Sequence, residues 1–90
     1  MCYLRGHPAD YDTWAADGNP GWSFAEVLPY FLRAENQERG ASAFHGVGGP
    51  LNVADLRSPS QLTPRFVAAG IEAGLPFNND FNGESQEGVG

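Results

Sequence analysis

Lysine is absent from this chain, and cysteine occurs only once. A single cysteine, Cys2, excludes an internal disulfide and the disulfide framework typical of small secreted domains. All five cations are arginines, against eleven acidic residues, so the formal net charge is −6. Because binding to nucleic acid requires a basic face, we expect no nucleic-acid partner.

Long hydrophobic runs are also missing. No stretch approaches the roughly 18 to 20 apolar residues of a membrane span. The first ten residues, MCYLRGHPAD, lack the basic start and the apolar stretch of a signal peptide. We therefore expect a cytoplasmic chain without a membrane span.

Glycine, proline and aromatic residues are plentiful. The 90 residues include 12 Gly, 7 Pro, two Trp, three Tyr and six Phe. Disordered segments contain few aromatic residues, whereas a chain this short buries only a modest part of its surface. The composition predicts a loop-rich segment that packs against a larger body.

The first expected helix covers Pro8 to Ala16. Proline suits the first helical turn, where its missing N–H has no partner to lose. The Asp17–Gly18 pair is expected to end the helix. Residues three and four apart share a face of a helix, so these side chains are expected on one side: Tyr11, Trp14 and Ala15.

The clearest helix signal begins at Ser23. Ser23 and Glu26 have the spacing of a capping box, in which each side chain accepts a hydrogen bond from the other residue's amide. Trp22 precedes the cap and Val27 follows at the fourth helical position, which is the pattern of a hydrophobic staple. The sequence therefore predicts a helix start at residues 23 and 24.

The end of this helix and the following segment are less sharply marked. Pro29 should kink the helix or shift its first turn, and the helix is expected to fade over Glu35 to Glu38. Residues 39–50 read as a glycine-rich loop, and 51–53 as a short strand.

The last third contains one further expected helix, over Gln61 to Ala73, with Leu62 and Phe66 on one face. Gly74 is its candidate C-terminal cap. Residues 78–90 form a turn-rich tail.

The two histidines, His7 and His45, are candidates for metal ligands or for an acid–base pair. They stand 38 residues apart, with no Cys or carboxylate at ligand spacing, so we expect no metal site. His45 lies between Phe44 and Gly46, which predicts a loop residue that holds backbone by hydrogen bonds.

Other candidate groups have ordinary structural explanations. Gly46 to Gly49 lacks the spacing of a dinucleotide fingerprint and is read as a flexible loop. Cys2 is expected to be a buried structural thiol. Asp10 and Asp12 belong to the first turns of a helix, where carboxylates favour the dipole. No residue set in the chain is sufficient for catalysis, and no catalytic residue is assigned.

Five stretches, taken in order, resemble the glucose–methanol–choline (GMC) oxidoreductase family: MCYLRGHPADYDTW, GNPGWSFAEVLPYFLRAE, FHGVGGPLNV, RFVAAGIEAGLPFNND and FNGESQEGVG. The first is similar to the segment directly after the family's Gly-Gly-Ser-Ser-x-x-Asn flavin motif. Tyr3, Gly6 and Asp12 keep that signature's spacing of an aromatic, a small and an acidic residue. Within the family, the chain looks most like bacterial choline-dehydrogenase-like proteins.

The resemblance implies an α/β full-length protein with a Rossmann-type FAD/NAD(P)-binding fold. This chain would supply short helices and loops with little strand. The implied cofactor is FAD, and the implied reaction moves a hydride from the CH–OH group of a small-molecule alcohol to flavin N5. Oxygen and a quinone both remain open as electron acceptors, and so does membrane association of the full-length protein.

The resemblance also implies which residues touch the flavin. These are Met1, Cys2 and Tyr3, by apolar packing or a backbone amide. The family's catalytic His lies far beyond this segment, and neither His7 nor His45 matches it. Since the nucleotide-binding Gly-x-Gly-x-x-Gly motif is absent, the isolated chain is predicted to be inactive.

Two regions follow from the resemblance. Residues 1–40 would form the flavin lid and the following helix of the FAD-binding domain. Residues 41–90 would lead into the substrate domain, as a partial segment. The rival interpretation is a stand-alone acidic interaction module without flavin chemistry, which the short length and the charge of −6 suggest.

Overall fold

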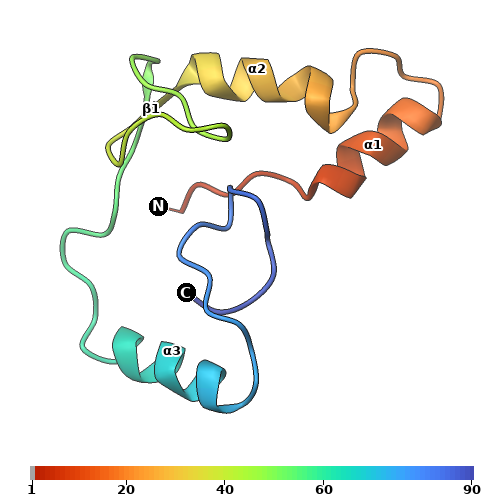
Figure 1. Ribbon diagram of the computed structural model, residues 1–90. Coiled ribbons are helices and arrows are strands. Elements are labelled where there is room, and N and C mark those ends of the chain that lie inside the picture. The colour runs from red at the N-terminus through yellow and green to blue at the C-terminus, as the bar shows by residue number, and fades with distance from the viewer. Residues whose placement is uncertain (1) are drawn as a thin grey trace. The chain divides into compact units, whose positions relative to one another are not determined.

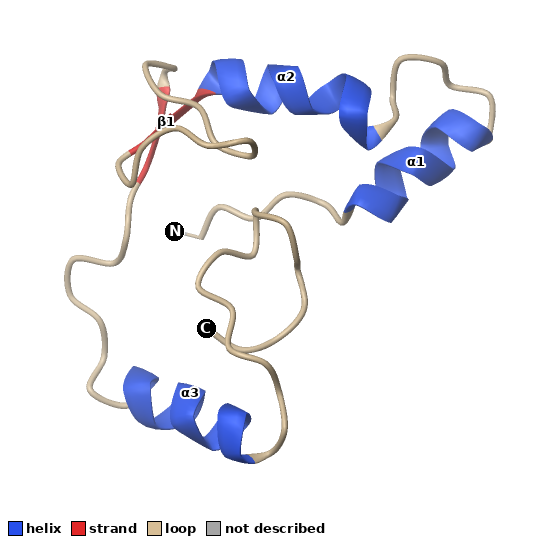
Figure 2. Ribbon diagram, viewed as in Figure 1, coloured by secondary structure: helices blue, strands red, loops and turns tan. Residues whose placement is uncertain are grey.

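The computed structural model describes residues 2–90. Its elements are α1 (Pro8–Ala16), α2 (Phe24–Ala34), β1 (Glu35–Gln37), β2 (Leu51–Val53) and α3 (Thr63–Glu72), as Figures 1 and 2 show. The chain divides into two compact units. The first unit runs to Ala54 and the second covers Asp55–Gly90, and each is described by itself. Short helices, loops and little strand agree with the expectation from the sequence.

Helix α1 has the bounds expected from the sequence, but its cap was missed. His7 Nδ1 accepts a hydrogen bond from the Ala9 amide at 3.0 Å. In return, the His7 amide donates to Asp10 Oδ2 at 3.0 Å. The sequence predicts no cap at His7, because histidine is not among the usual capping residues.

Helix α2 begins with the predicted capping box. The Glu26 amide donates to Ser23 Oγ at 3.4 Å, and the Ser23 amide donates to Glu26 Oε2 at 3.2 Å. The Phe24 amide donates to Asp12 Oδ1 at 3.0 Å, which ties α1 to the start of α2. The helix continues through Pro29, which stands inside it.

The sequence predicts that helix α2 fades gradually over Glu35 to Glu38, but the structure shows an abrupt end. It ends at Ala34, and Glu35 enters β1 directly with φ −90° and ψ 142°. β1 pairs in parallel with β2, whose predicted bounds are confirmed, and Glu35 lies opposite Leu51. The change to extended backbone places the Glu35 side chain in the interior, where its partners lie.

The glycine-rich loop between the strands packs closely against the end of α2. A Cβ atom on Gly46 would stand 1.8 Å from the Leu32 carbonyl oxygen. One on Gly49 would stand 2.4 Å from the carbonyl of Ala34. The prediction of a flexible loop therefore missed a backbone contact that only glycine permits at these two positions.

In the second unit, Gly74 ends α3 as predicted. Its φ is +99°, and its amide donates to the Ile71 carbonyl at 3.0 Å. The Leu75 amide donates to the Gly70 carbonyl at 3.0 Å, which completes a Schellman motif. The helix is shorter than predicted at its start, because Thr63 is its first residue.

The tail of the second unit folds back onto α3. Val89 is 7% exposed, and its amide donates to the Pro76 carbonyl at 2.9 Å. A Cβ atom on Gly70 would stand 2.9 Å from Val89 Cγ1, so the bare backbone of Gly70 makes room for valine. The Asn78 amide donates to the Val89 carbonyl at 2.9 Å.

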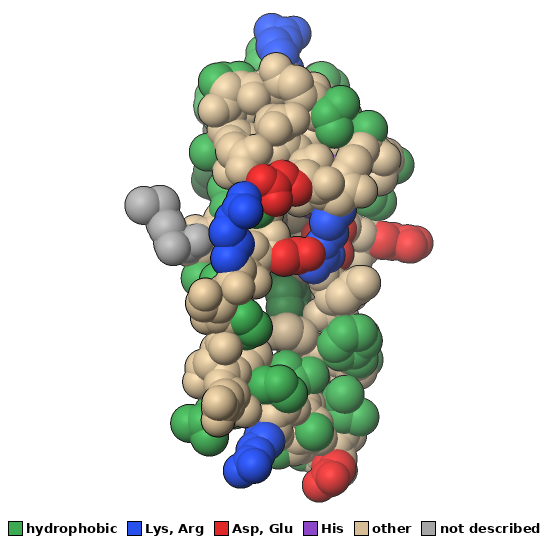
Figure 3. All heavy atoms as spheres, turned by 90° about the vertical axis from the view of Figure 1, so that its left-hand side faces the viewer, with side chains coloured by type: hydrophobic (Ala, Val, Ile, Leu, Met, Phe, Trp, Pro, Cys, Tyr) green, Lys and Arg blue, Asp and Glu red, His purple; other side chains and the backbone are tan. Residues whose placement is uncertain are grey.

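Among the described residues, more of the buried side chains are ionisable than apolar. Among the described residues the buried apolar side chains are Val27 and Val89, whereas Arg5, Glu35 and His45 are buried ionisable ones. The expected apolar face of α3 is open to solvent, with Leu62 69% and Phe66 74% exposed. Figure 3 shows hydrophobic side chains distributed over the face that it presents. Within residues 2–90, no helix has the length and apolar character needed to cross a membrane.

Candidate functional site

The segment that the resemblance assigns to the flavin is short and largely open to solvent. Met1 lies outside the described residues. Cys2 is exposed, so the expectation of a buried thiol is wrong. Tyr3 is half-buried and Leu4 is 63% exposed. Residues 2–7 contain neither helix nor strand. The position of this segment therefore depends on side-chain contacts with residues later in the chain.

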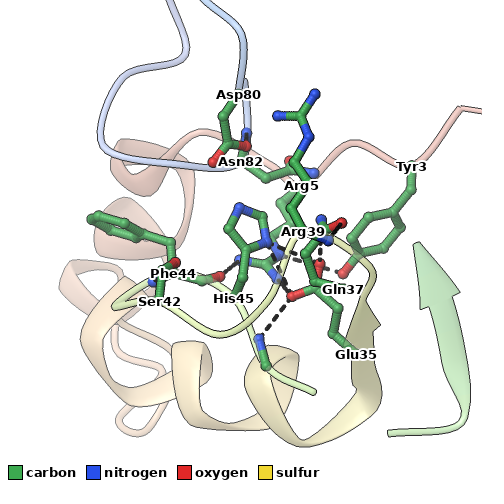
Figure 4. Close-up of polar contacts among 11 residues, drawn as sticks. Tyr3, Arg5, Glu35, Gln37, Arg39, Ser42, Phe44, His45, Asp80 and Asn82 are labelled. Atoms are coloured by element: carbon green, nitrogen blue, oxygen red, sulfur yellow. Dashed lines mark hydrogen bonds and ion pairs between the residues drawn. The ribbon is translucent and has the colours of Figure 1, made fainter. Parts of the chain in front are cut away.

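Arg5 supplies that anchor. Its side chain is only 2% exposed. Nη2 donates to Glu35 Oε2 at 2.9 Å, and Nη1 donates to the Phe44 carbonyl at 2.6 Å. Nε donates to the Tyr3 hydroxyl at 3.3 Å. One guanidinium therefore joins the N-terminal segment, the start of β1 and the loop that follows it, as Figure 4 shows.

Aromatic rings complete the surroundings of Arg5. The guanidinium carbon lies 5.0 Å from the centre of the Phe31 ring and 5.8 Å from that of Tyr3. Both distances are within the range of a cation–π interaction. Phe31 lies on α2, so the inner side of that helix also fixes the position of Arg5.

Glu35 is the centre of the cluster and is fully buried. His45 Nδ1 lies 3.0 Å from Oε1, and the Gly46 amide donates to Oε2 at 3.0 Å. Gln37 Nε2 donates to Oε1 at 3.4 Å. Because a buried carboxylate is costly unless it is paired and hydrogen-bonded, these donors and Arg5 together make its burial possible.

His45 is a loop residue, as predicted. The sequence suggested that its ring would hydrogen-bond to backbone, whereas Nδ1 faces the Glu35 carboxylate. Since an ionised carboxylate only accepts hydrogen bonds, Nδ1 is assigned as the donor. Sequence reasoning missed the whole cluster of Arg5, Glu35 and His45. No regular spacing links residues 5, 35 and 45, so no motif could have revealed it.

A second cluster in the first unit is aromatic. The Tyr11 ring lies 5.2 Å from Trp14, 6.2 Å from Phe24 and 5.9 Å from Phe31. Trp14 and Trp22 are 6.0 Å apart in an edge-to-face arrangement. An apolar hollow of about 530 Å³ opens beside this cluster and is lined by Tyr11, Gly21, Trp22, Val27, Tyr30 and Phe31.

The two tryptophans pack on each other but remain half-exposed, at 47% for Trp14 and 53% for Trp22. Indole offers one N–H donor and no useful titration, so these rings are suited to packing. In this chain the packing is among α1, α2 and the turn between them.

The described residues suit the flavin ring of FAD but not its pyrophosphate. Cys2, Tyr3 and Leu4 offer an accessible, mainly apolar strip, which is suited to packing against a large planar ring. Helix N-termini attract phosphates, but the starts of α1 and α2 each hold a carboxylate, from Asp10 and Glu26. These carboxylates would repel a pyrophosphate.

The Glu26 carboxylate is well suited to its capping role. Hydrogen bonds from the Ser23 hydroxyl, and then from the Ser23 amide, hold its pKa below the ordinary value. The group therefore stays ionised at neutral pH. No cluster of three or more potential metal ligands occurs in residues 2–90.

Comparison with known proteins gives consistent matches. The family model described as GMC oxidoreductase matches residues 1–90. An oxygen-dependent choline dehydrogenase of Brucella anthropi is 47% identical over 90 residues, which is 100% of this chain and 16% of that protein.

Two solved structures resemble the fold. An FAD-dependent oxidoreductase from Chaetomium thermophilum superposes with a TM-score of 0.83 and 33% identity, over 96% of this chain and 17% of that one. Pyridoxine 4-oxidase from Mesorbium loti gives a TM-score of 0.72 and 39% identity, over 82% of this chain and 15% of that one. The chain thus spans about a sixth of the length of the curated relatives that it matches.

Proposed function

Because this chain belongs to the GMC oxidoreductase family, we propose that the full-length protein containing it is an FAD-dependent oxidoreductase of alcohols. Bound FAD would supply a hydride acceptor at flavin N5, and the CH–OH group of the substrate would become an aldehyde or ketone. The observation that carries the proposal is the family match over the whole chain. That match favours the enzyme over a stand-alone acidic module.

The substrate proposed is a small-molecule alcohol. Support comes from the names of two similar proteins, a choline dehydrogenase and a pyridoxine 4-oxidase, since choline and pyridoxine both carry hydroxyl groups. The term oxygen-dependent in the first name supports oxygen as the electron acceptor.

Within that enzyme, this chain would help to cover the flavin. Met1, Cys2 and Tyr3 would contact the flavin through apolar packing or a backbone amide, as residues 1–40 form the lid and the following helix. Residues 41–90 would lead into the substrate domain. The accessible strip at Cys2 and Leu4 supports this role, because such a strip can pack against a planar ring.

The test uses the full-length protein, purified and supplied with FAD. We expect a flavin absorption spectrum at one FAD per protein chain. Under anaerobic conditions, an alcohol from a panel that includes choline and pyridoxine should bleach the oxidised flavin band. A protein that retains no FAD, or whose flavin no alcohol reduces, would contradict the proposal.

The isolated 90-residue chain is the matched comparison. We expect no stoichiometric, sub-micromolar complex with FAD, because the helix starts of the first unit hold carboxylates where a pyrophosphate would need amides. Titration followed by flavin fluorescence measures this directly. A tight complex would show that the chain contains a cofactor site of its own.

A further inference from the structure

We propose that Arg5 is a positioning residue for the flavin, acting through Tyr3 and the short backbone segment before it. The inference rests on the proposed function, in which residues 1–3 face the cofactor. Arg5 itself is buried and is not assigned a contact with FAD. Its role is to fix the place and orientation of the half-buried Tyr3 and of the exposed Cys2, which lie outside any helix or strand.

The first argument is the short connection. A fully extended chain advances at most about 3.3–3.6 Å per residue, so the Cα atom of Cys2 lies within about 11 Å of the Cα atom of Arg5. Arg5 is held at its far end by Glu35 and by the Phe44 carbonyl, which belong to a packed strand and loop. A displacement of the Arg5 side chain would therefore pass directly to the segment that faces the flavin.

The second argument is that Arg5 contacts Tyr3 in two ways. The Tyr3 hydroxyl accepts a hydrogen bond from Nε at 3.3 Å, and the ring lies 5.8 Å from the guanidinium carbon. The planar fork of arginine serves Tyr3, Glu35 and Phe44 at once. Lysine has a single ammonium group and cannot reproduce three contacts in fixed directions.

The third argument is that Glu35 is itself supported. The Gly46 amide and the His45 ring hold the carboxylate that binds Arg5. The contacts thus run from the loop at residues 45 and 46 through Glu35 to Arg5 and Tyr3. The positive charge of Arg5 is compensated by its partner, so the cluster acts by geometry and presents no unpaired cation.

The experiment compares three variants of the full-length holoprotein: Arg5→Lys, Tyr3→Phe and the control Arg33→Lys. Arg33 is an exposed residue of α2 whose guanidinium carbon lies 5.3 Å from the Tyr30 ring, and it is not part of the cluster. The measurements are the Kd for FAD, the shape of the visible flavin bands and the melting temperature.

For Arg5→Lys we expect the Kd for FAD to rise about tenfold, the effect of losing one hydrogen bond to a charged group. The flavin bands of molecules that still hold FAD should also change. Tyr3→Phe should change the bands in the same direction by a smaller amount, and Arg33→Lys should leave both readouts unchanged.

Two results would overturn the inference. One is an Arg5→Lys variant with the wild-type Kd and wild-type flavin bands. The other is a variant that melts earlier but keeps unaltered bands in the FAD-bound fraction, since this is what a purely structural role predicts. If Arg5→Lys does not fold, wild-type bands in Tyr3→Phe would have the same meaning. A wild-type protein that binds no FAD would instead contradict the proposed function.

Discussion

Each of the two units is organised around one polar side chain, and the two differ in charge and in burial. Glu35 in the first unit is ionisable and fully buried. Asn78 in the second is neutral and half-buried. Its Nδ2 donates to the carbonyls of Ser85 and Glu87 at 2.7 and 3.0 Å, and its Oδ1 accepts from the Asp80 amide at 2.9 Å.

The two centres differ in whether water can replace a lost hydrogen-bond partner. When a partner of Asn78 is lost, solvent can take its place, so each hydrogen bond contributes only its small net free energy. When a partner of Glu35 is lost, a charge remains in the interior without solvation. The two centres should therefore respond very differently to mutation.

The largest effect is expected for Glu35→Gln. It leaves the buried guanidinium of Arg5 without its counter-ion, which should reduce local stability by about 3–5 kcal/mol. The measurement is native-state amide hydrogen exchange over residues 35–46 of the full-length protein.

The double variant Arg5→Met/Glu35→Leu is the control for Glu35→Gln. By removing both charges together, it should recover part of the loss. Unchanged exchange in Glu35→Gln would show that the cluster is open to water.

A second test concerns the glycines that adjoin each centre. Gly46→Ala places a methyl group against the backbone of α2 and should cost about 1–3 kcal/mol or more. Gly83→Ala is the counterpart in the second unit, where the nearest atom to the new methyl, at 2.7 Å, is the Asp80 carboxylate. A side-chain end can move away, so we expect a smaller loss there. Equal losses in thermal melting would contradict the distinction between rigid and yielding neighbours.

Asn78→Ala measures the second unit directly. The change removes three side-chain hydrogen bonds, but the two carbonyls that it frees belong to the exposed residues Ser85 and Glu87. We therefore expect a loss of about 1–2 kcal/mol. Hydrogen exchange over residues 78–90 gives the value. A loss as large as that of Glu35→Gln would remove the contrast between the units.

The smallest effect should come from the helix starts. Ser23→Ala removes the cap of α2 and should cost about 1 kcal/mol. Leu62→Ala at the start of α3 removes no cap, because Leu62 makes no side-chain capping hydrogen bond. Circular dichroism during thermal unfolding compares the two variants. Equal melting temperatures for wild type and Ser23→Ala would count against the capping box.

This cap should also depend on pH. Because the folded-state pKa of Glu26 is lowered, chiefly by the Ser23 hydroxyl, its contribution is fully present above the ordinary value of 4.5. It is lost as the pH falls through the lowered pKa. The difference between wild type and Ser23→Ala should therefore shrink in acid. A difference that stays constant down to pH 2 would contradict this assignment.

Local signals in the sequence were reliable guides to local structure. The bounds of α1, the capping box at Ser23, the strand at Leu51–Val53 and the end of α3 at Gly74 all depend on neighbouring residues. The structure confirms them. The abrupt end of α2 at Glu35 was not predicted, because it depends on partners at residues 5 and 45 that no local pattern relates to it.

The candidate site was less accessible to sequence reasoning. The flavin-facing residues came from a family resemblance, and they remain a proposal. The sequence does not predict the burial of Arg5, since a lone arginine beside a glycine usually lies in solvent. Its burial follows from the joint presence of a carboxylate, a carbonyl and two aromatic rings that only the folded chain brings together.

The ion pair between Arg5 and Glu35 has a consequence for synthesis of the protein. The two residues are 30 positions apart, whereas His45 is 10 positions from Glu35. At about 5–20 residues per second, Arg5 is incorporated about 1.5 to 6 seconds before Glu35.

Loop closure is also easier over the shorter span. We therefore expect His45 and Gly46 to gather around Glu35 first, and Arg5 to dock last. In refolding kinetics, substitutions at His45 should then slow folding, whereas those at Arg5 should mainly speed unfolding. The N-terminal strip would become ordered only at the end, when the pocket for its guanidinium is already built.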